Sequence, residues 1–201
     1  MSDLFGSNVF NSVAMDGADV KYAAHVDLGL DPQRLFLELR DEIPWRQEEV
    51  SVWGKRHLQP RLIFWMGDSG KGYAYSGIAL RPEPWSPRIA AIKKTIERLL
   101  GRSFNSVLLN YYRDNRDSMG MHSDDEPELG PEPVIASLSI GAVRTLTFKS
   151  KLNSDSRKLR LESGSLLVMA GQTQKNWKHG IGKETAPCGG RINLTFRTIY
   201  S

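Results

Sequence analysis

His122 and Asp124 have the side-chain types and the spacing of metal ligands. On an extended strand, residues two apart point to the same side, so the imidazole and the carboxylate can bind one ion. His179 offers a third ligand, because the apolar stretch 163–171 before it predicts a strand that runs antiparallel nearby. Two histidines and one carboxylate leave coordination positions open on Fe(II). The sequence therefore predicts an iron site made of these three residues.

A second His-x-Asp pair, His25 and Asp27, shows that this spacing alone is weak evidence. The pair precedes a capped helix and does not continue a strand. No residues suited to binding a cosubstrate follow it at a short, regular distance. We interpret it as a pair with ordinary surface or packing roles.

The stretch 191–197 gives the His122 pair its chemical context. Arg191, Asn193 and Arg197 share one face of a predicted strand, and the apolar residues between them face the core. Two arginines on an inner face are costly unless they meet anions. A ligand with a carboxylate at each end meets that need, since a guanidinium can bind a carboxylate through two parallel hydrogen bonds. Alternatively, one arginine pairs in part with Asp124. An earlier strand adds two neutral donors, Asn110 and Tyr112.

These side chains need a scaffold, and the chain predicts one that is mainly β with flanking helices. Residues 31–43 predict a helix capped by Asp31, and residues 86–100 predict a second one that ends at Gly101. Most of the remainder is short stretches rich in β-branched and aromatic residues, typical of a β-sandwich or jelly roll. They are residues 48–53, 60–66, 72–80, 104–112, 134–141, 144–149, 158–162, 165–170 and 191–200.

The composition predicts one globular domain. A chain of 201 residues can bury a core without disulfides or a structural metal. Residues 1–29 show little periodicity and predict a loosely attached N-terminal extension to a single domain at 30–201. Cys188 is the only cysteine, no apolar run reaches the length of a membrane span, and the N-terminus lacks the layout of a secretory signal. We therefore expect a monomeric cytoplasmic protein with no membrane partner. The net charge of +4 permits an anionic partner such as nucleic acid.

The motifs together resemble those of the AlkB dioxygenases. In chain order they are N-x-Y at Asn110 and Tyr112, H-x-D at His122 and Asp124, IASLSIGAVRTLTF at 135–148, His179, and R-x-N-x-T-x-R at Arg191, Asn193, Thr195 and Arg197. The likeness runs from about residue 45 to the C-terminus. The stretch HSDDEPELG at 122–130, followed by IASLS, resembles the eukaryotic-type homologues that repair alkylated DNA more than the founding bacterial enzyme.

The resemblance implies a double-stranded β-helix, the jelly roll predicted above, at residues 86–201. A nucleotide-recognition lid with a hairpin would precede it at residues 44–85. The resemblance also implies that His122, Asp124 and His179 bind Fe(II). Arg191 would hold the distal carboxylate of 2-oxoglutarate, with Arg197 near the carboxylate beside the metal. Three further residues would complete that pocket: Asn110, Tyr112 and Asn193.

The activity that this resemblance implies is oxidative demethylation of N-alkylated bases in DNA, namely 1-methyladenine and 3-methylcytosine. Decarboxylation of 2-oxoglutarate with O2 would be coupled to release of formaldehyde, succinate and CO2. The methyl groups sit on the base-pairing edge, so the base must leave the stack. The partner would be single- or double-stranded DNA, or RNA. When it acts on DNA, the protein would be found at the nucleoid or in the nucleus. An Fe(II)/2-oxoglutarate hydroxylase that acts on RNA, protein or a small molecule remains an alternative. A non-catalytic nucleic-acid-binding module fits less well, because the metal and arginine residues are intact.

The base pocket is predicted around the stretch 72–77 and the acidic run after the metal pair. Tyr73 and Tyr75 share a side of a strand, and by resemblance Tyr75 would sandwich the base against the His122 ring, with Ser76 at the border. Glu126 lies two residues beyond Asp124 and would accept a hydrogen bond from the exocyclic amine of a cationic damaged base. Asp125 alternates to the other side and is expected to give structural support.

A hairpin tip at Val52, Trp53 and Gly54 is the candidate wedge for the gap left by the base. Packing of Trp53 beneath the hairpin explains that residue equally well. Nearby lysines and arginines would contact phosphates and so supply affinity that does not depend on sequence. The candidates for such contacts are Lys55, Arg56, Lys151 and Lys158.

Overall fold

The structure is a computed structural model that describes residues 10–52, 55–70, 73–75, 78–80 and 82–200. Residues 51, 52, 55, 73–75 and 78–80 are described by their backbone alone. Within these ranges no helix is long and apolar enough to cross a membrane.

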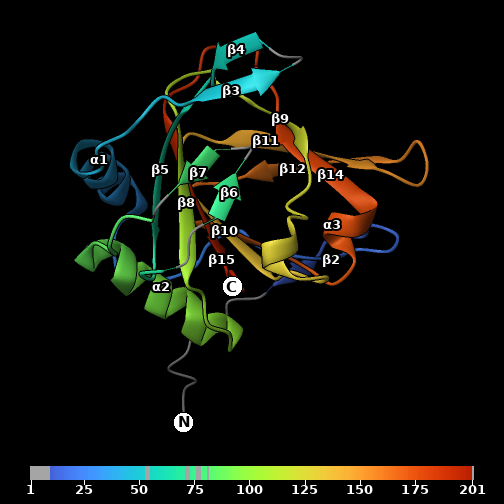
Figure 1. Cartoon of the computed structure of the whole chain (residues 1–201), viewed down its shortest axis with the longest axis horizontal. Coiled ribbons are helices and arrows are strands. Elements are labelled where there is room, and N and C mark those ends of the chain that lie inside the picture. Colours follow the sequence, from blue (N-terminus) through green and yellow to red (C-terminus); the bar gives the residue numbers. More distant parts are fainter. Residues whose placement is uncertain (1–9, 53–54, 71–72, 76–77, 81, 201) are drawn as a thin grey trace.

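Two antiparallel sheets form the body of the described structure (Figure 1). In the described ranges the major sheet has seven strands, in the order β1-β2-β13-β10-β15-β8-β5. They are β1 (Asn11–Ser12), β2 (Asp19–Ala23), β13 (Ser165–Ala170), β10 (Ile135–Gly141), β15 (Arg191–Arg197), β8 (Ser106–Tyr112) and β5 (Leu62–Gly67). The minor sheet has the order β12-β11-β14-β9. Its strands are β12 (Ser156–Leu161), β11 (Arg144–Ser150), β14 (Trp177–Ile181) and β9 (Met119–His122). Side chains from both sheets pack into one apolar cluster, so the predicted jelly roll is confirmed.

Two helices cover the outer face of the major sheet (Figure 1). α1 (Pro32–Glu42) begins where the Asp31 carboxylate accepts a hydrogen bond from the Arg34 amide. α2 (Pro87–Leu100) begins in the same way at Ser86 and ends at Gly101, whose φ of 61° suits glycine. Both helices match the sequence prediction.

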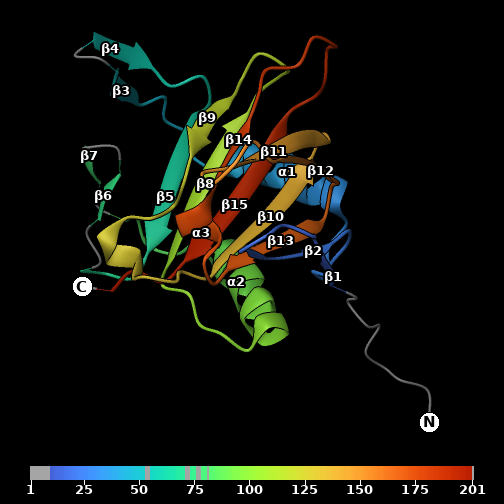
Figure 2. The same ribbon diagram turned by 90° about the vertical axis from the view of Figure 1, so that its right-hand side faces the viewer.

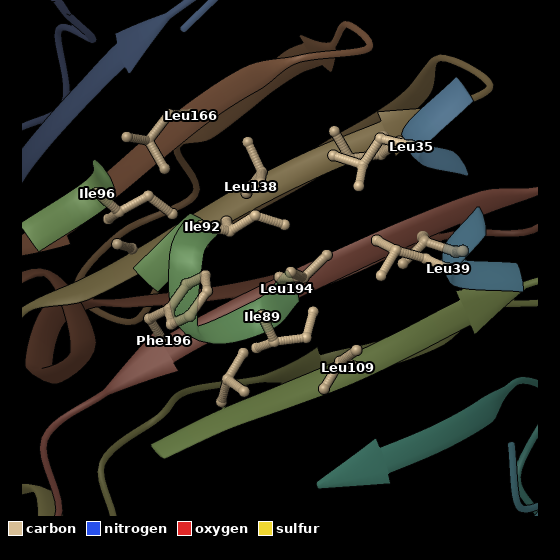
Figure 3. Packing of buried hydrophobic residues seen from close by; sticks show 14 of the residues in the cluster. Leu35, Leu39, Ile89, Ile92, Ile96, Leu109, Leu138, Leu166, Leu194 and Phe196 are labelled. Atoms are coloured by element: carbon tan, nitrogen blue, oxygen red, sulfur yellow. The ribbon is translucent and has the colours of Figure 1, made fainter. Parts of the chain in front are cut away.

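The helices and the major sheet share a fully apolar layer (Figure 3). Leucines of α1 and isoleucines of α2 point at alternate residues of four strands. The labelled members of this layer are Leu35, Leu39, Ile89, Ile92, Ile96, Leu109, Leu138, Leu166, Leu194 and Phe196. Because strand side chains alternate, the residues between these in β8, β10 and β15 point to the opposite face, toward the minor sheet.

Two predictions about the N-terminal part are wrong. β2 pairs with β13 from Asp19↔Ala170 to Ala23↔Leu166, so residues 19–23 belong to the major sheet and are not loosely attached. The stretch 72–80 is not one strand: β6 (Tyr73–Tyr75) and β7 (Ile78–Leu80) pair antiparallel. β2 was missed because it is only five residues long and its burial pattern does not alternate strictly, so its sequence carries little strand periodicity.

The segment 44–85 contains two separate hairpins. β3 (Glu49–Val52) pairs with β4 (Lys55–Leu58), and this hairpin projects from one end of the sheets in both views (Figures 1 and 2). β6 and β7 form the second. Between the two hairpins the chain returns to the major sheet as its edge strand β5, which pairs with β8.

Candidate active site

The predicted metal and cosubstrate residues converge on one cavity between the two sheets. Pairing explains this: β15 and β8 align Arg191 with Tyr112 and Asn193 with Asn110, and paired residues point to the same face. β14 and β9 align His179 with His122 from the opposite sheet. The eight predicted residues that line the cavity are Asn110, Tyr112, His122, Asp124, His179, Arg191, Asn193 and Arg197.

Three of these residues form a compact ligand set. One ligand atom from each of His122, Asp124 and His179 lies within 4.8 Å of the others. Nε2 of His122 lies 3.7 Å from Oδ1 of Asp124, and Nε2 of His179 lies 3.8 Å from Oδ2. Within the described residues, these three side chains form the group whose ligand atoms lie close enough together to hold a metal ion. His25 and Asp27 do not belong to it.

The protonation of the two histidines suits metal binding. Nδ1 of His122 lies 2.9 Å from the carbonyl oxygen of Gly120. A carbonyl only accepts, so Nδ1 carries the proton and leaves the Nε2 lone pair for a metal. Burial lowers the pKa of His179 to about 3, so this imidazole is neutral at physiological pH. Burial thus keeps His179 in the form that binds a metal, and the Gly120 contact orients the His122 ring so that its Nε2 lies toward Asp124.

Asp124 is a buried carboxylate held as an anion. Burial is the largest single influence and would raise its pKa, but the charges of Arg197, His179 and His122, together with the Arg197 hydrogen bond, outweigh it, and the pKa falls to about 2. Nη2 of Arg197 donates to Oδ1 over 2.7 Å. This is the pairing that the sequence left open as the alternative role for one arginine. One part of the prediction is wrong: β9 ends at His122, so Asp124 lies just past the strand and not on it.

The other arginine lies where a second carboxylate could be bound. Arg191 is 2% exposed and donates from Nη2 to the hydroxyl of Ser139 over 2.9 Å. Its guanidinium also lies over the Tyr112 ring, 5.2 Å from the centroid. Nε and Nη1 are buried without a hydrogen-bond partner among the described residues. Burial lowers the pKa of Arg191, but the group stays a cation, and leaving its donors unmet is costly.

A polar network holds the side chains between the two arginines. Nδ2 of Asn193 donates to the Ser137 hydroxyl over 2.8 Å, and Thr195 donates to Oδ1 of Asn193 over 2.8 Å. Oδ1 of Asn110 accepts from Nε of Arg61 over 2.7 Å. These contacts fix the amides that line the cavity.

The residues present fit Fe(II) and 2-oxoglutarate. Asp124 keeps one buried oxygen, Oδ2, without a hydrogen-bond partner in the described structure, and this oxygen lies 3.8 Å from Nε2 of His179. Two donors of Arg191 are unmet in the same cavity. A divalent cation would satisfy the first group, and a carboxylate the second.

The predicted base-binding residues are less completely described. Tyr73 and Tyr75 lie on β6 with their backbones alone described, and Ser76 lies outside the described residues. Glu126 caps the short 3₁₀ helix η1 (Pro127–Leu129), and its Oε2 is buried without a hydrogen-bond partner in the described part. Trp53 and Gly54 also lie outside the described residues, and Val52 is described by its backbone.

The predicted phosphate contacts have different surroundings. Lys158 is exposed on β12, and exposed Arg56 lies 3.4 Å from a carboxylate oxygen of Glu49. Lys151 already has two oxygen partners, the Asp125 carboxylate at 3.2 Å and the Gln174 carbonyl at 2.8 Å. The backbone of Lys55 is described on β4, but its side chain is not. The contact with Lys151 gives the Asp125 carboxylate a structural partner.

Three buried polar residues near the site were not predicted. Arg61 has the residue type of a surface cation, yet it is buried against Asn110. Arg144 is buried and donates to the carbonyls of residues 114, 117 and 182, and so ties the loop before β9 to the end of β14. Gln174 accepts from the Asp124 amide over 2.9 Å. The even spacing of Arg144 within a strand pattern was a usable signal, but nothing in the sequence marked Gln174.

Comparison with known proteins places this site in a family. The 2OG-Fe(II) oxygenase superfamily matches residues 31–197. DNA oxidative demethylase ALKBH2 of Homo sapiens is 36% identical over 198 residues, which cover 93% of this chain and 76% of that protein. The chain belongs to the AlkB family of 2-oxoglutarate and Fe(II)-dependent oxygenases. Its cofactors are accordingly Fe(II), 2-oxoglutarate and O2.

Other AlkB-family relatives match over less of their own length. Alpha-ketoglutarate-dependent dioxygenase alkB homolog 3 is 40% identical in Rattus norvegicus and 41% in Homo sapiens. These matches cover 89% and 81% of this chain, and 63% and 60% of the relatives. The chain therefore spans somewhat under two thirds of those proteins. The solved structure of OsALKBH1 shares the fold, with a TM-score of 0.62 at 17% identity over 94% of this chain and all of that one.

Proposed function

We propose that this AlkB-family chain oxidatively demethylates N-alkylated bases, 1-methyladenine and 3-methylcytosine, in DNA and so repairs alkylation damage directly. The observation that carries the proposal is the joint presence of the metal ligand set and the unmet donors of Arg191 in one cavity. The 36% identity to a protein named DNA oxidative demethylase supports the choice of substrate. With Fe(II) bound, 2-oxoglutarate and O2 supply the oxidising power that converts the N-methyl group to formaldehyde.

Each group of side chains has one task in this proposal. His122, Asp124 and His179 hold the metal through two imidazole nitrogens and one carboxylate. Arg191 binds the distal carboxylate of 2-oxoglutarate and thereby fixes which end of this cosubstrate approaches the metal. Arg197 keeps Asp124 ionised and lies beside the inner carboxylate. Burial of these groups excludes water and strengthens each electrostatic contact.

Glu126 supports a cationic base as the substrate. Its Oε2 is buried and has no hydrogen-bond partner among the described residues, two positions beyond a metal ligand. N-alkylation at the base-pairing edge gives adenine and cytosine a positive charge and leaves the exocyclic amine as a donor. A carboxylate at this place favours both features, whereas a neutral substrate would leave the buried anion uncompensated.

The proposal is tested with oligonucleotides that carry 1-methyladenine or 3-methylcytosine. They are incubated with the chain, Fe(II), 2-oxoglutarate and O2, and base mass, formaldehyde and succinate are measured. We expect turnover that His179→Ala abolishes and that His25→Ala, at the exposed second His-x-Asp pair, preserves. Succinate production without any change in base mass would instead favour a hydroxylase for protein or small molecules.

The lid and the wedge form a second part of the proposal. We infer that residues 44–85 include the nucleotide-recognition lid, because their hairpin β3–β4 projects beyond the sheets (Figure 2). Trp53→Ala should then slow repair of duplex DNA more than repair of a single strand, since a wedge is needed only where a stack must be opened. Equal slowing on both substrates would count against the wedge. Elution as a monomer, with full activity, would support a site complete within one chain.

A further inference from the structure

Asp124 lies where regular structure no longer holds the chain. β9 ends at His122, and the β9–β14 register reaches only His122↔His179 at this end. The main chain of Asp124 therefore has no strand partner, although its carboxylate must face two imidazoles and Arg197 at the same time. A position this constrained needs another support.

Gln174 supplies that support from a different element. It lies in the short helix α3 (Thr173–Asn176), immediately before β14, and is 2% exposed. Its side-chain oxygen Oε1 accepts from the Asp124 amide over 2.9 Å, while Nε2 points at the Met169 sulfur, 3.6 Å away. Gln174 does not itself line the cavity, but it contacts two residues that do, Asp124 and Met169.

The residues on either side of Asp124 are bound to the same segment. The Ser123 hydroxyl donates to the Trp177 carbonyl over 3.0 Å. Nζ of Lys151 joins the Asp125 carboxylate to the Gln174 carbonyl, at 3.2 Å and 2.8 Å. Ser123 and Asp124 are thus bonded directly to the segment that leads into His179, and Asp125 reaches it through Lys151. These contacts link the two segments that carry the metal ligands.

We propose that Gln174, supported by Lys151, is a positioning residue that fixes the main chain of Asp124 and so sets the geometry of the metal site. The inference rests on the metal site of the proposed function. Without the Gln174 oxygen, the Asp124 amide would be buried and unmet, and the loop would shift to find another partner. Removing such outer partners of metal ligands typically weakens metal binding about 10–100-fold.

The test measures the affinity of the full chain for Co(II), a spectroscopic stand-in for Fe(II), without 2-oxoglutarate or substrate. Gln174→Leu should weaken Co(II) binding about 10–100-fold. Gln174→Glu keeps an oxygen acceptor and adds negative charge. The Co(II) affinity of this variant should therefore lie within about threefold of that of the original chain or exceed it. The matched control is Gln172→Leu, because the amide of Gln172 contacts only the exposed Glu132 among the described residues. That control should bind Co(II) as the original chain does.

Lys151 gives a second test, in which the direction of the change in divalent-cation affinity distinguishes a charge effect from a positioning effect. If Lys151 acted only through its charge, Lys151→Met would strengthen binding of a divalent cation by removing a nearby positive charge. If it supports Gln174 and Asp125, the same change weakens binding. Lys149→Met, at an exposed lysine on β11 two residues before Lys151, removes an equal charge without these contacts and serves as control.

The outcomes separate this inference from the proposed function. No Co(II) binding by the original chain would overturn the metal site itself. Normal binding by the original chain and by Gln174→Leu would overturn only the positioning role. A packing role alone predicts that Gln174→Leu binds Co(II) normally once folded and that Gln174→Glu is the damaging change, which also overturns the inference. Thermal unfolding of the metal-free variants shows that each is folded at the temperature of the titration.

Discussion

The two faces of the major sheet differ although the same strands build both. Toward α1 and α2, strands β8, β10 and β15 present leucine, isoleucine and phenylalanine, and this layer is apolar throughout (Figure 3). Toward the minor sheet the same strands also present serine, asparagine and arginine, nearly as deeply buried and set among apolar residues such as Leu108 and Ile135. The face toward the helices stabilises the folded state, because burial of apolar surface is favourable. The second holds polar groups whose partners are incomplete until a metal and a dicarboxylate bind.

This contrast predicts that changes on the two faces act on different quantities. Substitutions toward the helices should change the free energy of unfolding and leave the affinity for 2-oxoglutarate intact. Substitutions toward the cavity should do the reverse. Five sets of measurements, from the largest expected effect to the smallest, test that separation.

The largest effect is expected from removing a metal ligand on the cavity side. His179→Ala should reduce turnover to the level without enzyme, because one imidazole of the ligand set is lost. Its apo stability should change far less than its activity. Parallel measurement of formaldehyde release and thermal unfolding checks this, and unfolding at assay temperature would undermine the interpretation.

Arg191→Met should separate binding from stability most clearly. Loss of two charge-assisted hydrogen bonds, each about 1.5–3 kcal/mol, predicts a rise in KM for 2-oxoglutarate on the order of 10²–10⁴-fold. The free energy of unfolding of the apo protein should stay the same or increase, because a buried cation with unmet donors is replaced by an apolar side chain. Denaturant unfolding without ligand checks the second half. A marked loss of apo stability would show that Arg191 also supports the fold.

Leu194→Ala changes the opposite face at a neighbouring strand position. Leu194 is fully buried in the layer beneath the helices, so its truncation should lower the free energy of unfolding by about 2–5 kcal/mol. KM for 2-oxoglutarate should remain within about threefold of the original value, since a variant that still folds retains the ligand cavity on the other face of the sheet. Asn193→Ala, one residue away, serves as the paired comparison and should mainly raise KM. If Leu194→Ala raised KM as much, the two faces would not be separable.

Loss of the charge of Glu126, two residues beyond the metal ligand Asp124, tests whether this side chain belongs to the base pocket. Glu126→Gln preserves size but replaces a charge-assisted contact by a neutral one, which predicts about a tenfold fall in kcat/KM for 3-methylcytosine. Glu128→Gln, two residues further on, is the matched control and should have no effect. Steady-state rates on the same oligonucleotide decide, and equal rates in all three proteins would remove Glu126 from the base pocket.

The smallest effect is expected at a helix end on the apolar side. The Ser86 hydroxyl accepts from the Ile89 amide at the start of α2. Ser86→Ala should therefore cost about 1 kcal/mol of stability with no change in turnover. Chemical denaturation measures the first quantity and the demethylation assay the second.

The sequence by itself determined the local features of this protein. Both helices were readable from their caps and apolar stripes, because capping and amphipathic burial act within a few residues. The cavity residues on strands β8 and β15 were readable from their even spacing, since alternation assigns each side chain to a face whatever the partner strand is. Asp124 was found by the same spacing although it lies past the end of its strand, and His179 was found by its place after a predicted strand. Recognition of the family from these motifs added the cofactors that Fe(II) and the arginines imply.

Only the tertiary structure decided how distant segments meet. β2 joins the major sheet through pairing with β13, more than a hundred residues away, and no local pattern encodes that choice. Arg61 lies buried against Asn110 and Arg144 ties two loops together, although both look like surface cations in the sequence. Asp124 reaches its partners from beyond the end of its strand, held by Gln174 of a different segment. Such contacts depend on which surfaces come together when the sheets pack, and that depends on the whole chain.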